Sequence, residues 1–412
     1  MDLEAISLIQ IHQFSTSNAK QQYVACFEKR YFEISNAVAR LIVILQESRT
    51  MDEACERYAI QKGCHVSQDE MGALIKRCII PIIHPTVSTK SKRTFLFSIE
   101  LLNVKSVGHF SNIGKFLFNK WIMLMLIIFS IGLEIIFLSQ DLTVYNISQV
   151  NIYTLIGIFS LLLFSSFIHE LGHASACRHY GIQHGSVGFG LYLNFPVFYT
   201  DVSGIWRLPR LQRLIVNMAG IYFQLILLIP LLLFYFNSYD NTLKYSLLVI
   251  NINFLITLNP FFKFDGYWII SDVLGVPNLR ERTKEFITYL TKKIRHQPVA
   301  QNPYLLQIKK RERYFVILYA CTVNIFFLYY FIFVIPVFLV HFWETTPALI
   351  KQTVINLASG TNPDFESIKT LLGQLIFFSL TVYVILRMVK MQLKRIYRNK
   401  SASENETITP QN

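Results

Sequence analysis

The residues that could do chemistry begin with a His-Glu-Leu-Gly-His segment at positions 169–173. Helical residues four apart share one face, so the imidazoles of His169 and His173 could bind one Zn²⁺, with the carboxylate of Glu170 beside a water on that ion. The segment lies inside an otherwise apolar run, Leu155 to Ala176. Because ionisable side chains are costly in hydrocarbon, this placement favours a functional site over a polar cluster that only packs helices.

A second polar segment, Asn259 to Gly266, ends a later apolar stretch and carries the carboxylate of Asp265. Together with two imidazoles, one carboxylate gives three ligands and leaves the fourth tetrahedral position open, which is typical of a catalytic zinc site. The amide of Asn259 has donors that could stabilise an oxyanion. The alternatives are that Asp265 is a helix-end carboxylate in interfacial water and that Asn259 packs helices.

The elements that must position these residues are membrane helices. Hydrophobic residues make up 52% of the chain and charged residues 16%, which is too apolar for a soluble globular protein. Six stretches approach or exceed the roughly 20 apolar residues that span a bilayer. They are residues 117–138, 154–176, 213–236, 246–270, 314–341 and 370–389. We therefore expect an α-helical polytopic membrane protein whose six-span domain covers residues 117–389.

The net charge of +13 follows the expected membrane topology. Lys and Arg collect before the first span, between the second and third, between the fourth and fifth, and after the last. This asymmetry predicts that both termini are cytoplasmic. It also predicts that His169 and Asp265 lie at one depth, in the cytoplasmic half of the membrane. No nucleic-acid motif accompanies the charge, so no nucleic-acid partner is expected.

Residues 1–80 have the pattern of a small cytoplasmic α+β domain. Two short strands are predicted before Ser35, which caps an amphipathic helix. Thr50 and Ser67 are each followed by a glutamate three residues later, which predicts the starts of two more helices.

The segments that flank the membrane domain carry no chemistry of their own. Residues 81–116 are expected to form a linker and an interfacial segment. Residues 390–412 are expected to form a basic juxtamembrane segment, followed by a disordered tail from Ser401.

The loop between the second and third spans has the pattern of a β-hairpin, whose open edge could pair with an extended substrate. Glycines alternate there with apolar residues, and we expect Gly188 and Gly190 to contact substrate. Asp201 follows in the same loop. It could stabilise a zinc-bound histidine or a substrate amine, or form a salt bridge with Arg207 or Arg210.

The two polar segments resemble the motifs of the site-2 protease family of intramembrane zinc metalloproteases, H-E-x-x-H on one core helix and N-P-x-x-x-x-D-G two helices later. The resemblance covers residues 150–275. It implies one catalytic Zn²⁺ held by three ligands, His169, His173 and Asp265. It further implies that Glu170 is the catalytic acid and base, and that Asn259 lies near the substrate carbonyl.

The N-terminal domain resembles the PqqD-like domains, winged-helix folds that capture leader segments of precursor peptides; a packing or regulatory domain is the alternative. The implied protein is a zinc endopeptidase of the bacterial inner or plasma membrane. It would cleave a precursor peptide near the cytoplasmic face, and a peptide exporter or modifying enzymes would be further partners. Two alternatives stay open: a protease for a membrane-anchored regulator or signal-peptide remnant, and a non-proteolytic membrane adaptor for a peptide exporter.

Overall fold

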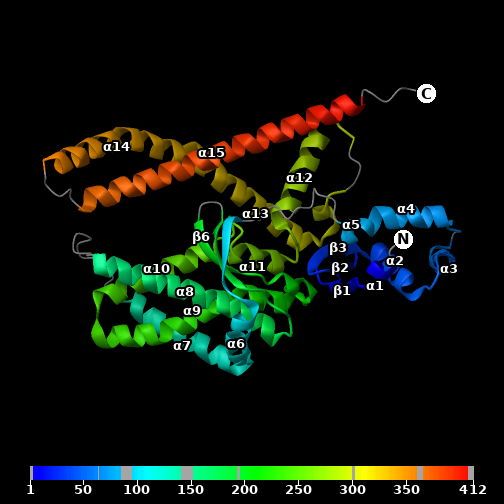
Figure 1. Ribbon diagram of the computed structural model, residues 1–412, viewed down its shortest axis with the longest axis horizontal. Helices are drawn as coiled ribbons and strands as arrows, with labels where there is room; N and C mark the ends of the chain where they lie inside the picture. The colour runs from blue at the N-terminus through cyan, green and yellow to red at the C-terminus, as the bar shows by residue number, and fades with distance from the viewer. Residues whose placement is uncertain are drawn as a thin grey trace. The chain divides into compact units, whose positions relative to one another are not determined.

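The computed structural model is mainly helical and divides into two compact units, Met1–Ala320 and Cys321–Asn412. It describes residues 3–63, 65–84, 95–140, 152–192, 195–298, 302–359 and 365–406. Among these residues, five helices are long and apolar enough to cross a membrane, one fewer than the sequence predicts. The predicted class, a polytopic α-helical membrane protein with a small α+β N-terminal domain, is confirmed (Figure 1).

The N-terminal domain is a three-stranded antiparallel sheet, in the order β1-β2-β3, packed against helices. Its strands are β1 (Gln10–Phe14), β2 (Gln22–Phe27) and β3 (Arg30–Ser35). Its helices are α1 (Leu3–Ser7), α2 (Asn36–Glu47), α3 (Met51–Lys62), α4 (Gln68–Cys78) and α5 (Ile80–Ile83). One apolar core, which includes Ala25, Ile42 and Ile75, joins the sheet to the helices. The two predicted strands and three predicted helices are present, whereas β1 and α1 were not predicted.

Side-chain caps explain where the helices of this domain begin. The hydroxyl of Ser35 accepts a hydrogen bond from the backbone of Val38. Ser67 and Glu70 form a complete capping box at the start of α4. Such caps satisfy backbone donors that have no partner within the helix, and each contributes about 1 kcal/mol.

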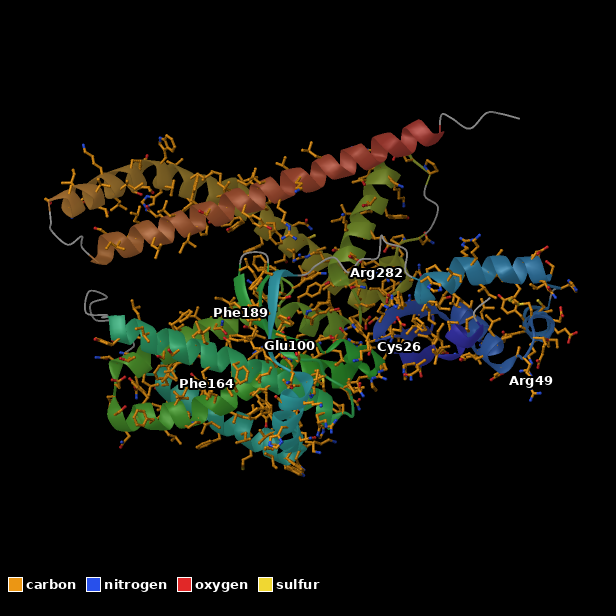
Figure 2. The ribbon with its side chains drawn as sticks, in the orientation of Figure 1. Cys26, Arg49, Glu100, Phe164, Phe189 and Arg282 are labelled. Atoms are coloured by element: carbon orange, nitrogen blue, oxygen red, sulfur yellow. The ribbon has the colours of Figure 1, made fainter. Side chains whose placement is uncertain are left out.

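Four helices of the membrane core pack side by side: α7 (Lys120–Leu138), α8 (Ile152–His179), α9 (Arg210–Ser238) and α10 (Asn241–Thr257). Helix α9 is central, because it contacts the other three. Buried apolar side chains, among them Phe137, Leu228 and Leu247, fill the space between the helices. The outer surface is also apolar. Phe164 on α8, labelled in Figure 2, is 50% exposed, as expected of a side chain that faces lipid.

The fourth predicted span is not one helix. Helix α10 has 17 residues and ends at Thr257, and a non-helical stretch that contains Pro260 separates it from α11 (Asp265–Leu274). Proline cannot donate the hydrogen bond that would continue a helix, so the chain turns here. The prediction of a continuous span over residues 246–270 is therefore wrong.

A second three-stranded antiparallel sheet has the order β4-β5-β6. Strands β5 (Val187–Tyr192) and β6 (Phe195–Thr200) form the predicted hairpin. Strand β4 (Phe95–Leu102) pairs with β5, although its residues were expected to belong to a linker and interfacial segment. Figure 1 shows β4 in cyan beside the green hairpin, and Figure 2 labels Glu100 on β4 and Phe189 on β5.

Short helical elements connect these parts. Helix α6 (Val104–Gly114) and the 3₁₀ helix η2 (Lys115–Phe118) lead from β4 to α7, and α6 packs on α8. The 3₁₀ helix η4 (Ser203–Arg207) joins β6 to α9. Helix α12 (Leu279–Ile294) and the 3₁₀ helix η5 (Tyr304–Gln307) follow α11.

The C-terminal unit consists of long helices. Helix α13 (Lys310–Tyr329) begins in the first unit and continues through a π-helical turn, η6 (Tyr330–Val334), into α14 (Ile335–Ala358). The resulting candidate span has 47 residues, so the predicted span 314–341 is only part of it. Helix α15 (Phe365–Glu406) contains the last predicted span and the basic segment in one helix. This helix extends through residues 401–406, the first part of the expected disordered tail, and residues 407–412 lie outside the described residues.

Candidate metal centre

Three predicted ligands from two helices meet at one point. His169 and His173, one turn apart on α8, bring their Nε2 atoms within 3.1 Å of each other. Oδ2 of Asp265 lies 2.8 Å from Nε2 of His169 and 3.2 Å from Nε2 of His173. Ligand atoms about 2.0–2.1 Å from a tetrahedral Zn²⁺ lie about 3.3 Å from one another. The three atoms therefore have close to the spacing that such an ion requires.

Hydrogen bonds from the other ring nitrogen orient both histidines. Nδ1 of His173 donates to the carbonyl oxygen of Val216, at 2.8 Å. Nδ1 of His169 lies 3.0 Å from Oε1 of Gln224, whose amide nitrogen donates to the hydroxyl of Ser165. Because carbonyl oxygens only accept, each Nδ1 carries the proton and each Nε2 keeps a free lone pair. Metal-binding histidines are typically oriented in this way.

Close packing of α8 against α9 buries the histidines. A Cβ at Gly220 would lie 2.4 Å from the ring of His169, and a Cβ at Gly172 would lie 2.3 Å from the carbonyl oxygen of Ala219. Both positions therefore require glycine if the helices are to approach this closely. His169 is 8% exposed and His173 is 7% exposed, so the two candidate histidine ligands are largely shielded from water.

The break after α10 places Asp265. A Cβ at Gly266 would lie 1.9 Å from the carbonyl oxygen of Leu258, so the start of α11 packs directly on the end of α10. The hydroxyl of Tyr319 donates to the carbonyl oxygen of Pro260, at 2.9 Å. This bond satisfies a carbonyl that the break leaves without a helical partner. Asp265 is the first residue of α11 and faces α8 as a result.

Glu170 follows the first ligand on α8 and is 8% exposed. Its backbone carbonyl accepts a hydrogen bond from the hydroxyl of Thr200, the last residue of β6, at 3.3 Å. Strand β6 therefore reaches the turn of α8 that carries the candidate ligands. A buried carboxylate next to a three-ligand centre is the kind of group that general acid–base catalysis requires.

Asn259 lies in the break between α10 and α11. Its Oδ1 accepts a hydrogen bond from the backbone N–H of Phe261, at 2.8 Å, and so stabilises the turn. The side-chain oxygen is thus used locally, and only the amide nitrogen has donors to offer an oxyanion. The catalytic role of Asn259 stays a prediction.

Gly188 and Gly190 lie on β5, the central strand of the second sheet. Gly188 is opposite Glu100 of β4 on one side and opposite Tyr199 of β6 on the other. A substrate strand cannot add to a strand that already has two neighbours. The outer edges of the sheet belong to β4 and β6, so substrate cannot pair with the backbone of β5, and contact of substrate with Gly188 and Gly190 stays a prediction.

Asp201 stabilises a turn after β6. Its Oδ1 accepts from the backbone of Ser203, at 2.9 Å, and its carbonyl oxygen accepts from the backbone of Gly185. Among the described residues it forms no ion pair with Arg207 or Arg210, and it is outside the group of candidate ligands. The predicted roles of Asp201 therefore find no support in its surroundings.

Two groups near the centre were not predicted. Gln224 is a polar residue inside the apolar run of α9, as His169 is inside the apolar run of α8. The second group is a buried ion pair between Nε of Arg213 on α9 and Oδ1 of Asp272 on α11, at 2.7 Å. Oδ2 of Asp272 also accepts from the amide of Asn217, at 2.7 Å.

Comparison with known proteins supports the chemical class of this centre. The chain is similar to a Bacillus subtilis (strain 168) protein named "putative peptide zinc metalloprotease protein YydH", with 29% identity over 111 residues. The match covers 26% of this chain and 44% of that protein, so it spans less than half of either. No protein-family model and no solved structure matches the chain. The similarity supports a zinc protease as the general class.

Proposed function

We propose that this protein is a membrane-embedded zinc endopeptidase of the site-2 protease type. The observation that carries the proposal is the convergence of His169, His173 and Asp265 next to the buried carboxylate of Glu170. Helix α8, which carries three of these four residues, is also a candidate membrane span. The similarity to a protein named as a peptide zinc metalloprotease supports the same class.

The residues of the centre fit a zinc ion and divide the work of peptide hydrolysis. Zinc, when held by the three ligands, would supply a water that ionises near neutral pH and would polarise the scissile carbonyl. Glu170 would accept the proton of the attacking water and return it to the leaving amine. The amide nitrogen of Asn259 would donate to the oxyanion, a contribution of about 3 kcal/mol in comparable sites.

Strand β6 is the edge that we propose for the substrate. Within the described residues no strand pairs with its outer side, and its last residue, Thr200, is hydrogen-bonded to Glu170. A peptide that adds to this edge would be held extended, with its peptide bonds exposed to attack. It would also run toward the catalytic carboxylate.

Two classes of substrate suit this arrangement. We favour a precursor peptide in peptide maturation or export, recruited by the PqqD-like domain, because that domain packs directly against the membrane core through residues 14–18. A membrane-anchored regulator or signal-peptide remnant is the second candidate, because the centre lies on a candidate membrane helix. A non-proteolytic adaptor would not need these four polar groups in catalytic order, three of them buried, since such groups are costly in a membrane. We place the protein in the bacterial inner membrane with cytoplasmic termini.

The test is co-expression with small peptides encoded beside the gene, followed by mass spectrometry of the peptide termini. We expect Glu170→Gln to retain zinc and to abolish cleavage. Glu134→Gln is a matched control, because Glu134 is another buried carboxylate, on α7, whose Oε2 accepts from Asn251 and which lies outside the centre. It should cleave as the wild type does. Undiminished processing by Glu170→Gln would refute the proposed mechanism.

A further inference from the structure

Helix α11 connects the metal centre to the N-terminal domain. It begins with Asp265, has 10 residues, and is followed by Gly275, whose φ is +64°. The break that precedes it means that α11 does not continue α10, although its first turn packs on the end of α10 at Leu258. Its direction therefore depends on the groups that contact it, among them α9 along its length and the N-terminal domain at its end.

The loop after β1 caps the C-terminal end of α11. The backbone N–H of Ser17 donates to the carbonyl oxygen of Gly275, at 2.8 Å, and its hydroxyl donates to the carbonyl oxygen of Leu274. Ser17 is 3% exposed, so water does not compete for these bonds. The last carbonyls of a helix have no partner within it. The N-terminal domain supplies such a donor to Leu274, the last residue of α11.

Arg213 fastens the same end of α11 from α9. Its Nε donates to Asp272, and its Nη2 donates to the carbonyl oxygen of Ser15, at 3.1 Å. The guanidinium lies 5.0 Å from the centroid of the Phe14 ring. A buried ion pair is stable only when its remaining hydrogen-bonding groups are also satisfied. Part of that satisfaction comes from the N-terminal domain.

The N-terminal domain makes a second contact that does not involve α11. Nη2 of Arg282 on α12 lies 2.9 Å from the carboxylate of Glu33 on β3. Figure 2 labels Arg282. This ion pair provides a control, because breaking it weakens the attachment of the domain without touching the helix that carries Asp265.

We propose that the N-terminal domain is a structural part of the metal centre, because residues 14–17 hold the end of α11 and thereby set the position of Asp265 at its start. Ser17, Arg213 and Asp272 are positioning residues, since they act on the ligand through the helix and not by contact. The inference rests on the proposed function for the identity of the three ligands. It adds that loss of the contacts that residues 14–17 make with α11 and Arg213 weakens zinc binding.

Two glycines give a matched test on the full-length protein in detergent. Gly275 and Gly181 both have left-handed backbone, with φ of +64° and +70°, so alanine strains both alike. A Cβ at Gly275 would lie 2.6 Å from the hydroxyl of Ser17, whereas a Cβ at Gly181 would meet nothing within 4 Å. We expect Gly275→Ala to weaken zinc binding about tenfold, as loss of outer support does in other zinc sites. Gly181 follows α8, the helix that carries the two histidines. The Gly181→Ala variant should bind zinc as the wild type does.

Equal zinc affinity of the two variants would overturn the inference and leave the proposed function standing. A wild-type protein that binds no zinc would overturn both. Zinc affinity is measured by titration against a chelator, so the result does not depend on finding the substrate.

A second measurement covers the case in which Gly275→Ala does not fold. Co²⁺ replaces zinc, and its absorption reports how many ligands surround it. We expect Ser17→Ala and Asp272→Asn to shift this spectrum toward that of Asp265→Ala, whereas Glu33→Gln leaves it unchanged. Wild-type spectra for both Ser17→Ala and Asp272→Asn would refute the positioning role.

Discussion

Oε1 of Gln224 on α9 lies 3.0 Å from Nδ1 of His169 on α8, so a third helix supports the candidate metal centre. The amide nitrogen of Gln224 is held in turn by the hydroxyl of Ser165, which fixes which end of the amide faces the histidine. The glutamine therefore acts as a fixed acceptor, as a carboxylate does behind many zinc-binding histidines.

Replacing Gln224 should weaken zinc binding without removing a ligand. We expect Gln224→Leu to lower zinc affinity about 10- to 100-fold, because the ring of His169 loses the acceptor that orients it. Gln224→Glu keeps an acceptor on each side and should retain most of the affinity. Chelator titration measures both variants. A leucine variant with wild-type affinity would show that the hydrogen bond does not orient the ligand.

The contact between Gly220 and His169 predicts a steric effect. Gly220→Ala would place a Cβ 2.4 Å from the imidazole ring, so the ring must move and zinc should be lost. Gly132→Ala on α7 is the control, because a Cβ there meets nothing within 4 Å. Alanine is favoured over glycine within a helix by about 1 kcal/mol, so the control should be at least as stable as the wild type. Zinc content of the purified variants decides the outcome.

The apolar core of the N-terminal domain predicts that alanine substitutions at two neighbouring residues of α2 differ greatly in their effect on stability. Ile42 is fully buried, whereas Val43 is 40% exposed. Ile42→Ala should destabilise the domain by about 2–5 kcal/mol, because it leaves a cavity. Val43→Ala should cost less than about 1 kcal/mol. Limited proteolysis of residues 1–80 over a urea series measures the difference, and similar midpoints for the two variants would contradict the assigned register of α2.

His12 on β1 should make the attachment of the N-terminal domain sensitive to pH. Burial first, and the positive charge of Arg207 second, lower the pKa of His12 from its ordinary value of 6.5. A released or unfolded domain therefore binds the proton more readily than the attached one. Stability is fully present above about pH 6.5 and falls as the pH drops through that value toward the lowered pKa.

Proteolysis of the domain between about pH 7.5 and pH 5 tests this dependence. His12→Gln removes the titrating group and should flatten the response in that range. The same slope in the glutamine variant would show that another group is responsible.

Local signals in the sequence predicted local structure well. Ser35 and Ser67 mark helix starts because their hydroxyls act on backbone groups only three residues away. The ligand motif could be recognised from the sequence just as readily. The spacing of His169 and His173 on a helix brings their rings together, whatever the rest of the fold does.

Features that depend on distant partners could not be predicted in the same way. Strand β4 is defined by its pairing with β5, and the sequence around Phe97 shows only an apolar segment. Hydropathy averaged over a window does not detect the break at Pro260, because the residues on both sides of it are apolar. The role of Gln224 requires that α9 packs against α8 with Gln224 level with His169, and no local pattern in the sequence specifies this alignment.

The pairing of β4 with β5 has a consequence for how the protein is made. Strand β4 precedes α7 and its partner follows α8, so both strands reach the same side of the membrane only if these two helices insert as a returning pair. A nascent chain carries β4 as an unpaired apolar edge until both helices are in place. Closure of the sheet thus reports correct insertion, and a chain that inserts wrongly retains the kind of edge that leads to aggregation.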